Sequence, residues 1–369
     1  MIDSKRRLAI IGLALVLGAA TLAALPAAGR WQQVAHAQQI RTRCVHALDA
    51  KRSWKARIVQ TETGSDGKCG VTSEEVLVRR PGSYRLTLSE TDEKGRPVVS
   101  TSIRTEGELY TRRVNADGSS VLHVVKGIRP SVGIELDNSL GQAVQAVSEA
   151  PQLTVAGQGV RGGRVADKLQ LEPGQFVWVD RESGMPIEQQ AGSAEFVADD
   201  VVFSDVQANV PAPDSEFDPS ALGGADSTVV EDLGFRNASA ARATAAIGFS
   251  PLSVPVPNGF SLDQQGYVDS KVPNGDAPTE PSFVSAFSNG LDGVVVTQVL
   301  RPGLGDSVPA AATEGPDAPA SITVGGKPAI YYEDAFRRQL VFARGDILVT
   351  VEGSMSESAM EELAGSIRQ

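Results

Sequence analysis

The chain has 369 residues, enough for two domains and for a sizeable hydrophobic core. Hydrophobic residues make up 41% of it and charged residues 21%, which excludes a disordered chain and a multi-span membrane protein. The net charge of −11 argues against nucleic acid as a partner, and three His with two Cys are too few for a His- or Cys-rich metal site. We therefore expect no metal and no cofactor.

The N-terminal segment predicts the compartment. Lys5, Arg6 and Arg7 precede 21 uncharged residues, 8–28. A basic flank before an apolar stretch is typical of export, so an extracytoplasmic protein is expected, either secreted or periplasmic, or held by an N-terminal transmembrane segment. Residues 1–37 are then a signal peptide, cleaved after Ala35-His36-Ala37, or a retained membrane anchor. The sequence leaves both alternatives open.

The two cysteines bear on the same question. Cys44 and Cys69 lie 25 positions apart. In an oxidising compartment two such thiols are expected to form a disulfide. The alternative is two free buried thiols.

The first elements in chain order are a short helix and a series of strands. Apolar residues recur with helical spacing in 38–52 and again behind Asn138, where Pro151 ends the pattern. Between and after these helices the apolar period is two, and turn residues separate the segments. The strands are expected at 54–61, 75–79, 84–90, 98–104, 109–114, 121–126, 153–156, 165–171, 175–180, 187–191, 195–197 and 201–206.

A change in composition predicts the domain boundary. Pro, Gly and Asp are frequent between 211 and 234, so we expect residues 221–236 to be a linker. Beyond it, a helix is predicted at 237–247 and a last helix behind a capping box that begins at Ser354. The strands of this part are expected at 282–288, 294–300, 321–324, 329–333, 339–343 and 347–352.

These elements predict an α+β protein. Residues 38–220 would form a curved antiparallel sheet, a half-barrel closed by short helices. Residues 237–369 would form a smaller α+β domain.

Two short motifs have ordinary structural explanations. Gly157 to Gly162 matches a dinucleotide-binding pattern, yet a further strand pattern follows it and no helix does, so a glycine-rich hairpin is predicted. Arg344-Gly345-Asp346 lies between two apolar runs, where a tight hairpin turn is expected.

Catalytic chemistry has little support in the sequence. His46 and His123 are the only histidines beyond the export segment, and no Gly-x-Ser-x-Gly motif occurs. We expect His123 to be exposed on a strand. Adjacent carboxylates on a strand point to opposite faces, so pairs such as Asp199-Asp200 suit solvation better than acid/base catalysis. The chain is predicted not to be an enzyme, although an envelope hydrolase that uses carboxylates stays an alternative.

Apolar side chains gather on one side of three predicted strands. If a curved sheet brings them together, its interior is either a packed core or a cavity for a lipid-like ligand, and the sequence alone favours the packed core. The candidate ligand-binding residues are Trp54, Ile58, Tyr84, Leu86, Leu88, Phe176 and Trp178.

Three segments together resemble the LolA-type lipoprotein carrier fold, which the RseB/MucB-type sigma-factor regulators share. The first is Val78-Arg79-Arg80-Pro81-Gly82-Ser83-Tyr84-Arg85. The second is Val177-Trp178-Val179-Asp180 with Gly184-Met185-Pro186, and the third runs from Val201 to Asn209 and on to Ser215-Glu216-Phe217. The resemblance covers about residues 38 to 220.

The resemblance implies a half-barrel that holds acyl chains and has no catalytic residue. A LolA-like domain joined to a smaller C-terminal domain is similar to the RseB arrangement, which implies a sensor of envelope stress. Its partners would be a lipid or acylated ligand and a membrane-bound protein of the anti-sigma-factor type, which would bind the C-terminal domain. The alternative is a LolA-like periplasmic or extracellular carrier of lipids or lipoproteins.

Overall fold

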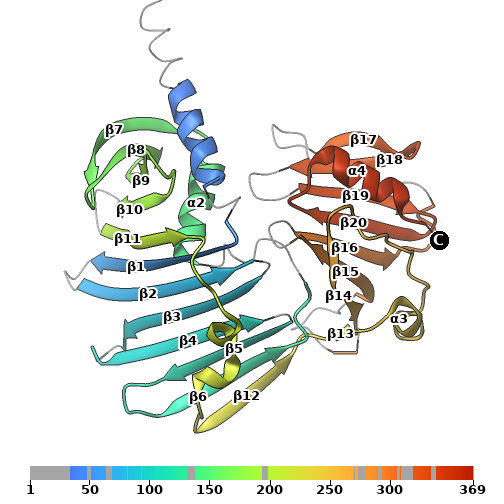
Figure 1. The fold of residues 1–369 in the computed structure, drawn as a ribbon, viewed down its shortest axis with the longest axis horizontal. Helices are drawn as coiled ribbons and strands as arrows, with labels where there is room; N and C mark the ends of the chain where they lie inside the picture. Colours follow the sequence, from blue (N-terminus) through green and yellow to red (C-terminus); the bar gives the residue numbers. More distant parts are fainter. Residues whose placement is uncertain are drawn as a thin grey trace, which may run out of the picture.

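The protein contains two β-sheets and few helices (Figure 1). The computed structural model describes residues 34–47, 51–63, 69–80, 82–92, 94–105, 107–130, 138–192, 198–269, 271–272, 280–289, 293–305, 308, 319–333 and 338–368. The apolar segment 8–28 and the strand expected at 195–197 lie outside these ranges.

The first sheet has twelve strands in the order β12-β6-β5-β4-β3-β2-β1-β11-β10-β9-β8-β7. Neighbouring strands are antiparallel except β12, which pairs parallel with β6. The sheet remains open, with β12 and β7 at its edges (Figure 1). Its strands are β1 (Ser53–Thr63), β2 (Cys69–Arg79), β3 (Ser83–Thr91), β4 (Pro97–Thr105), β5 (Glu108–Val114), β6 (Ser120–Lys126), β7 (Thr154–Arg161), β8 (Arg164–Glu172), β9 (Gln175–Asp180), β10 (Pro186–Gly192), β11 (Ala198–Ala208) and β12 (Ser227–Asp232).

Two helices pack on one face of the first sheet, and two short 3-10 helices pack on the other. Helix 34–45 and α2 (Ser139–Glu149) share a cluster of buried residues with β8 and β9. Asn138 caps α2, as predicted, because its side chain accepts a hydrogen bond from the Gly141 amide. On the other face, η2 (Asp214–Phe217) and η3 (Pro219–Leu222) cover Ile103 with Phe217 and Leu222.

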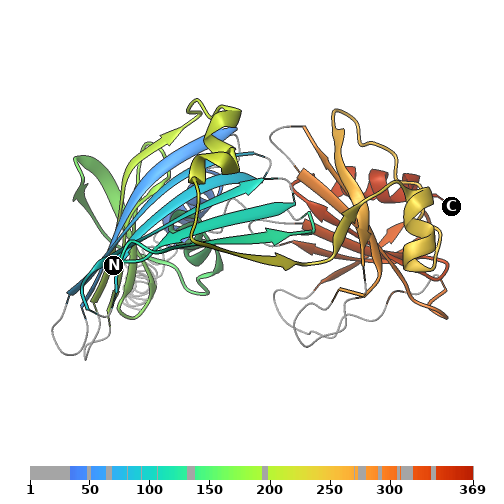
Figure 2. The same ribbon diagram turned by 90° about the horizontal axis from the view of Figure 1, so that it is seen from below.

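The second sheet has eight strands in the order β13-β14-β15-β16-β20-β19-β18-β17 (Figure 1). Figure 2 shows this sheet, in orange and red, in the half of the molecule that contains the C-terminus. Helices α3 (Ala240–Ile247) and α4 (Glu357–Ser366) cover one of its faces. Gly248 ends α3 in the left-handed conformation, and Ser356 caps α4. The strands are β13 (Phe235–Asn237), β14 (Ser261–Val268), β15 (Ser282–Ser288), β16 (Gly293–Leu300), β17 (Ala320–Val324), β18 (Lys327–Glu333), β19 (Arg338–Arg344) and β20 (Ile347–Gly353).

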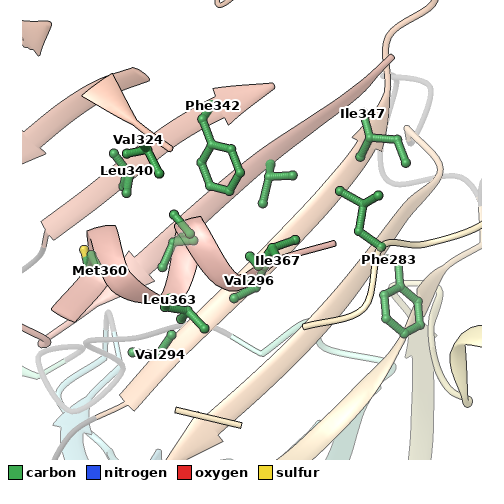
Figure 3. Packing of buried hydrophobic residues seen from close by; sticks show 14 of the residues in the cluster. Phe283, Val294, Val296, Val324, Leu340, Phe342, Ile347, Met360, Leu363 and Ile367 are labelled. Atoms are coloured by element: carbon green, nitrogen blue, oxygen red, sulfur yellow. The ribbon is translucent and has the colours of Figure 1, made fainter. Parts of the chain in front are cut away.

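The core of the second sheet lies between its strands and these helices (Figure 3). Residues alternate between buried and half-buried along β20, as expected of a strand with one face on a core. Phe342 and Leu340 of β19 and Met360 of α4 have no exposed surface.

The segment expected as a linker contains a strand. Residues 227–232 form β12 and extend the first sheet, and β13 follows within three residues and opens the second sheet. At this junction Gly127 has a φ of +62°, and a Cβ there would lie 3.0 Å from backbone atoms of Phe235. The guanidinium of Arg129 also donates to the Thr297 hydroxyl of the second sheet. Backbone pairing and a side-chain bond therefore connect the two sheets here.

The expected disulfide is absent, and this prediction is wrong. Cys44 belongs to helix 34–45 and is buried where the helix packs on the sheet, and this burial raises the pKa of its thiol to about 12. Cys69 is exposed and pairs with Thr63 at one end of the β1–β2 hairpin. Trp54 lies at the other end of this hairpin, where it packs with Ala47 just beyond the end of helix 34–45. Nine residue steps along a strand, from Trp54 to Thr63, span roughly 30 Å, whereas a disulfide requires Cα atoms within about 7 Å.

Candidate functional site

The face of the first sheet that packs on α2 carries most of the predicted ligand-binding residues. We call it the helix face, and it carries Trp54, Ile58, Val76, Val177 and Phe203. Helix α2 divides its apolar side chains between two clusters on this face. Leu140 and Ala143 pack with β1 and β2, while Val144 and Val147 pack with β8 and β9. One short helix thus covers strands from both halves of the sheet.

Five of the seven predicted ligand-binding residues lie on the helix face. Trp54 and Ile58 are closed off, with 0% and 1% of their surfaces exposed. Tyr84 and Leu86 are half-buried at the margin of the same cluster, and Leu88 is half-buried one step further along β3. Burial on this face therefore decreases from β1 to β3.

Phe176 and Trp178 lie on the opposite face of the sheet. Their neighbours Val177 and Val179 face the helices, and side chains alternate along a strand. The Arg161 guanidinium stacks 4.3 Å from the Trp178 ring centroid. The structure therefore does not bring all seven residues into one interior, and their part in ligand binding stays a prediction.

Gly159 of the glycine-rich hairpin lies beside this indole. A Cβ at Gly159 would lie 3.3 Å from two ring atoms of Trp178. The β7–β8 hairpin was predicted, and it turns at Gly162 and Gly163, both with positive φ. The motif thus has a packing role against Trp178.

Glu74 is a buried carboxylate on the helix face that the sequence reasoning missed. Glu74 lies on β2, where it pairs with Ile58 of β1, and 7% of its surface is exposed. Ser139, the first residue of α2, donates to it from the side-chain hydroxyl at 2.6 Å and from the amide at 3.4 Å. Burial raises the pKa of Glu74, and the two Ser139 bonds lower it by less. Glu74 therefore joins β2 to the positive end of α2.

A pair of carboxylates, Glu188 and Asp200, lies on the face opposite the helices. Burial, followed by the charge of Asp200, raises the pKa of Glu188. Arg161 is 3.3 Å from Glu188 and offsets part of that repulsion. Neither carboxylate lines the two cavities described below. Glu188 therefore has the raised pKa that acid catalysis uses but lies in neither of these cavities.

Helix 34–45 carries the third group of charged side chains. Asp167 of β8 has a side chain that is 2% exposed, and its Oδ1 accepts from Arg181 Nε at 2.8 Å and Nη2 at 2.7 Å. Oδ2 lies 3.6 Å from Arg43 Nη2 and 3.9 Å from His36 Nε2. These residues are far apart in sequence, so no local motif could have predicted the group.

Two cavities adjoin this helix. The smaller, about 420 Å³, is lined by Asp167, Arg181 and the 36–43 part of the helix. The larger, about 600 Å³, lies between the outer side of the helix, Lys51 and Ser183. Gln39 and Arg43 line both. None of the seven predicted ligand-binding residues lines either cavity.

The remaining sequence predictions concern catalysis and membrane spanning. His123 is exposed on β6, as predicted. Within the described ranges, no three His, Cys, Asp or Glu side chains are grouped so as to hold a metal ion. Among the same residues, no helix has the length and apolar character needed to cross a membrane.

The fold is similar to several solved structures. MucB is 16% identical, over 90% of this chain and 98% of that chain, with a TM-score of 0.32. A LolA superfamily protein from Nitrosomonas europaea is 10% identical, over 49% and 97%, with a TM-score of 0.24. A DUF1329 family protein from Desulfovibrio piger is 12% identical, over 52% and 99%, with a TM-score of 0.26.

These structures include the two groups that the sequence motifs resemble, so the resemblance to an RseB/MucB- or LolA-like fold is confirmed. Such low TM-scores carry no argument about function. No protein-family model matches the sequence, and no curated protein sequence matches it. Functional inference therefore depends on the residues of this chain.

Proposed function

We propose that the chain is a non-catalytic binding protein of the cell envelope that holds an acyl chain against the helix face. The observation that carries this proposal is the decrease in burial along that face. Trp54 is fully enclosed under α2, whereas Leu86 and Leu88 of β3 are only half-buried. Half-buried leucines in a row leave apolar surface for an aliphatic ligand to cover.

The strands beyond β3 support the same ligand class. Leu88 pairs with Ser100 and Leu86 with Ser102, and Ser102 is hydrogen-bonded to Thr111 at 2.9 Å. Apolar side chains next to hydrogen-bonded hydroxyl groups suit an aliphatic ligand that carries a polar group. Glu74, the carboxylate that pairs with Leu88 on this face, is buried and accepts a hydrogen bond from Ser139, an arrangement that supports binding without catalysis.

We further propose that the second sheet binds a protein partner and that the whole chain acts as a sensor of envelope stress. Tyr332 is 38% exposed, and Ile330 and Val341 beside it on the same sheet face are half-buried. Aromatic and aliphatic residues of this kind are enriched at protein interfaces. One of the solved structures similar to this chain is that of MucB in complex with MucA. A carrier of lipids or lipoproteins is the second candidate.

Extraction tests the proposal. The full-length chain, purified in a neutral detergent, would be extracted with organic solvent and the extract analysed by mass spectrometry. We expect an acylated amphiphile that is missing from a mock purification. Its repeated absence would contradict the proposed function. Sequencing the mature N-terminus separates the two candidates, because a carrier is released whereas a sensor can keep its anchor.

A further inference from the structure

The larger cavity beside helix 34–45 is basic, although the chain as a whole is acidic. Nine residues of the described part of the chain line it, and none of these nine is Asp or Glu. Arg43 and Lys51 supply two permanent positive charges. In a chain of net charge −11 this local excess of positive charge favours an anionic ligand.

Neutral donors accompany these charges. Gln38, Gln39 and Thr42 are exposed on the helix within one turn of one another, and all three line the cavity. Amides and hydroxyls donate to oxyanions with little loss of hydration. The lining therefore offers a tetrahedral anion both charge and several hydrogen bonds.

The geometry of the cavity is fixed by the turn after β9. Gly184 in this turn has a φ of +76°, and a Cβ there would lie 2.7 Å from the Arg43 carbonyl oxygen. Arg43 Nη1 donates to the Arg181 carbonyl at 3.0 Å. The turn therefore packs directly against the helix and positions Arg43 at the boundary of the two cavities.

The nearby carboxylate does not cancel this charge. Asp167 lines only the smaller cavity, where Arg181 neutralises it through two hydrogen bonds to the same oxygen. Arg43 forms an ion pair with the other oxygen, at 3.6 Å, and also lines the larger cavity. Two arginines beside one carboxylate leave this group with a net positive charge. Arg43 is thus the group that distinguishes this cavity from an ordinary surface hollow.

We propose that the larger cavity binds a phosphate group, with Arg43 and Lys51 as its principal ligands. A guanidinium presents a planar fork that matches phosphate oxygens, and an ammonium adds a compact charge. The phosphate can belong to free inorganic phosphate or to the headgroup of a phospholipid, which share this chemistry. The site is separate from the β3 leucines, so its test does not depend on the acyl-binding proposal.

Calorimetric titration of the full-length chain in neutral detergent tests this proposal. Sodium phosphate would be the probe, with chloride adjusted to hold ionic strength constant. We expect saturable binding that R43Q weakens by about tenfold, as the loss of one charge-assisted bond predicts. K51Q should weaken binding by a smaller factor. Dihexanoyl phosphatidic acid, titrated in parallel, identifies the source, because tighter binding than that of inorganic phosphate indicates a lipid headgroup.

R57Q is the matched control. Arg57 is an exposed arginine of β1, 3.9 Å from Glu75 and on the sheet face opposite the helices. Its loss removes the same charge without touching the cavity, so affinity should stay within about twofold. Circular dichroism would verify that the variants are folded. No saturable binding of either probe, or equal affinity of folded R43Q and R57Q, would overturn the proposal.

Discussion

The two sheets bury their apolar residues in different ways. The second sheet has one large core, to which strands β15 to β20 and both helices contribute, and only a small cluster on its other face. The first sheet divides its buried residues among separate clusters on its two faces, with Glu74 and Asp167 buried among them. A continuous core fixes a structure, whereas a divided one leaves half-buried positions at the edges of its clusters. The first sheet is therefore the part suited to take up a ligand.

Deleting large side chains should expose this difference most strongly. F342A removes a fully buried ring of the second core and should cost about 3–5 kcal/mol of unfolding free energy. L86A removes a half-buried side chain and should cost about 1 kcal/mol, since its site is already partly open to water. Urea denaturation measures both. Equal losses would show that the first sheet is packed as tightly as the second.

The start of helix 34–45 provides the next test. Ala37 has no exposed surface, and His36 lies beside Asp167, so the helix packs through residues that cleavage after Ala37 would remove. A chain that begins at Gln38 should be less stable than one that begins at Val34 by about 1–2 kcal/mol. Thermal unfolding of the two chains checks this. Identical melting temperatures would mean that the first helical turn adds nothing.

The helix caps compare the two regions directly. Asn138 caps α2 from a buried position, whereas Ser356 caps α4 at the surface. Both substitutions by alanine remove one capping bond, but N138A also leaves a buried Gly141 amide unpaired. We expect a loss of about 1–2 kcal/mol for N138A and about 0.5–1 kcal/mol for S356A. The reverse order in chemical denaturation would contradict this assignment.

Glu74 gives the smallest effect and a defined pH dependence. Burial raises the pKa of Glu74, so the folded state keeps this proton to a higher pH than the unfolded chain does. Its contribution to stability therefore falls as the pH rises through the raised pKa. E74Q keeps an acceptor for Ser139 without the charge, and it should stabilise the protein above that pKa by about 0.5–1 kcal/mol. A stabilisation that is independent of pH would exclude this explanation.

Strongly periodic segments were predicted well from the sequence. The strands expected at 84–90 and 121–126 lie within one residue of β3 and β6, and the hairpin turn at Gly345 lies between β19 and β20 as predicted. Local alternation and turn chemistry suffice for these elements. The strand β14 was missed because Asp263, Gln264, Gln265 and Gly266 interrupt its apolar pattern. Its pairing with β13 and β15 supplies what the local sequence lacks.

Long-range features could not be predicted in the same way. All four residues from Phe176 to Val179 are apolar, so the period of two does not say whether the aromatic or the valine pair faces the helices. Phe176 and Trp178 were the predicted pair, whereas Val177 and Val179 face the helices. The strand β12 was hidden in a Pro- and Gly-rich stretch and forms by pairing with β6, about a hundred residues earlier. The cap of α4 is Ser356 and not Ser354. The capping-box spacing from Ser354 to Glu357 favoured the earlier serine, whereas Ser356 has Ala359 at the corresponding position.

Uptake of a fluorescent fatty acid tests the central claim most directly. Leu88 lies half-buried on the helix face, and Val99 of the neighbouring strand lies 37% exposed on the opposite face. The account predicts that the wild-type chain and V99D take up the probe, while L88D, which places a charge against the acyl chain, loses at least about tenfold in affinity. Equal uptake by L88D and V99D, or no uptake by the wild-type chain, would contradict it.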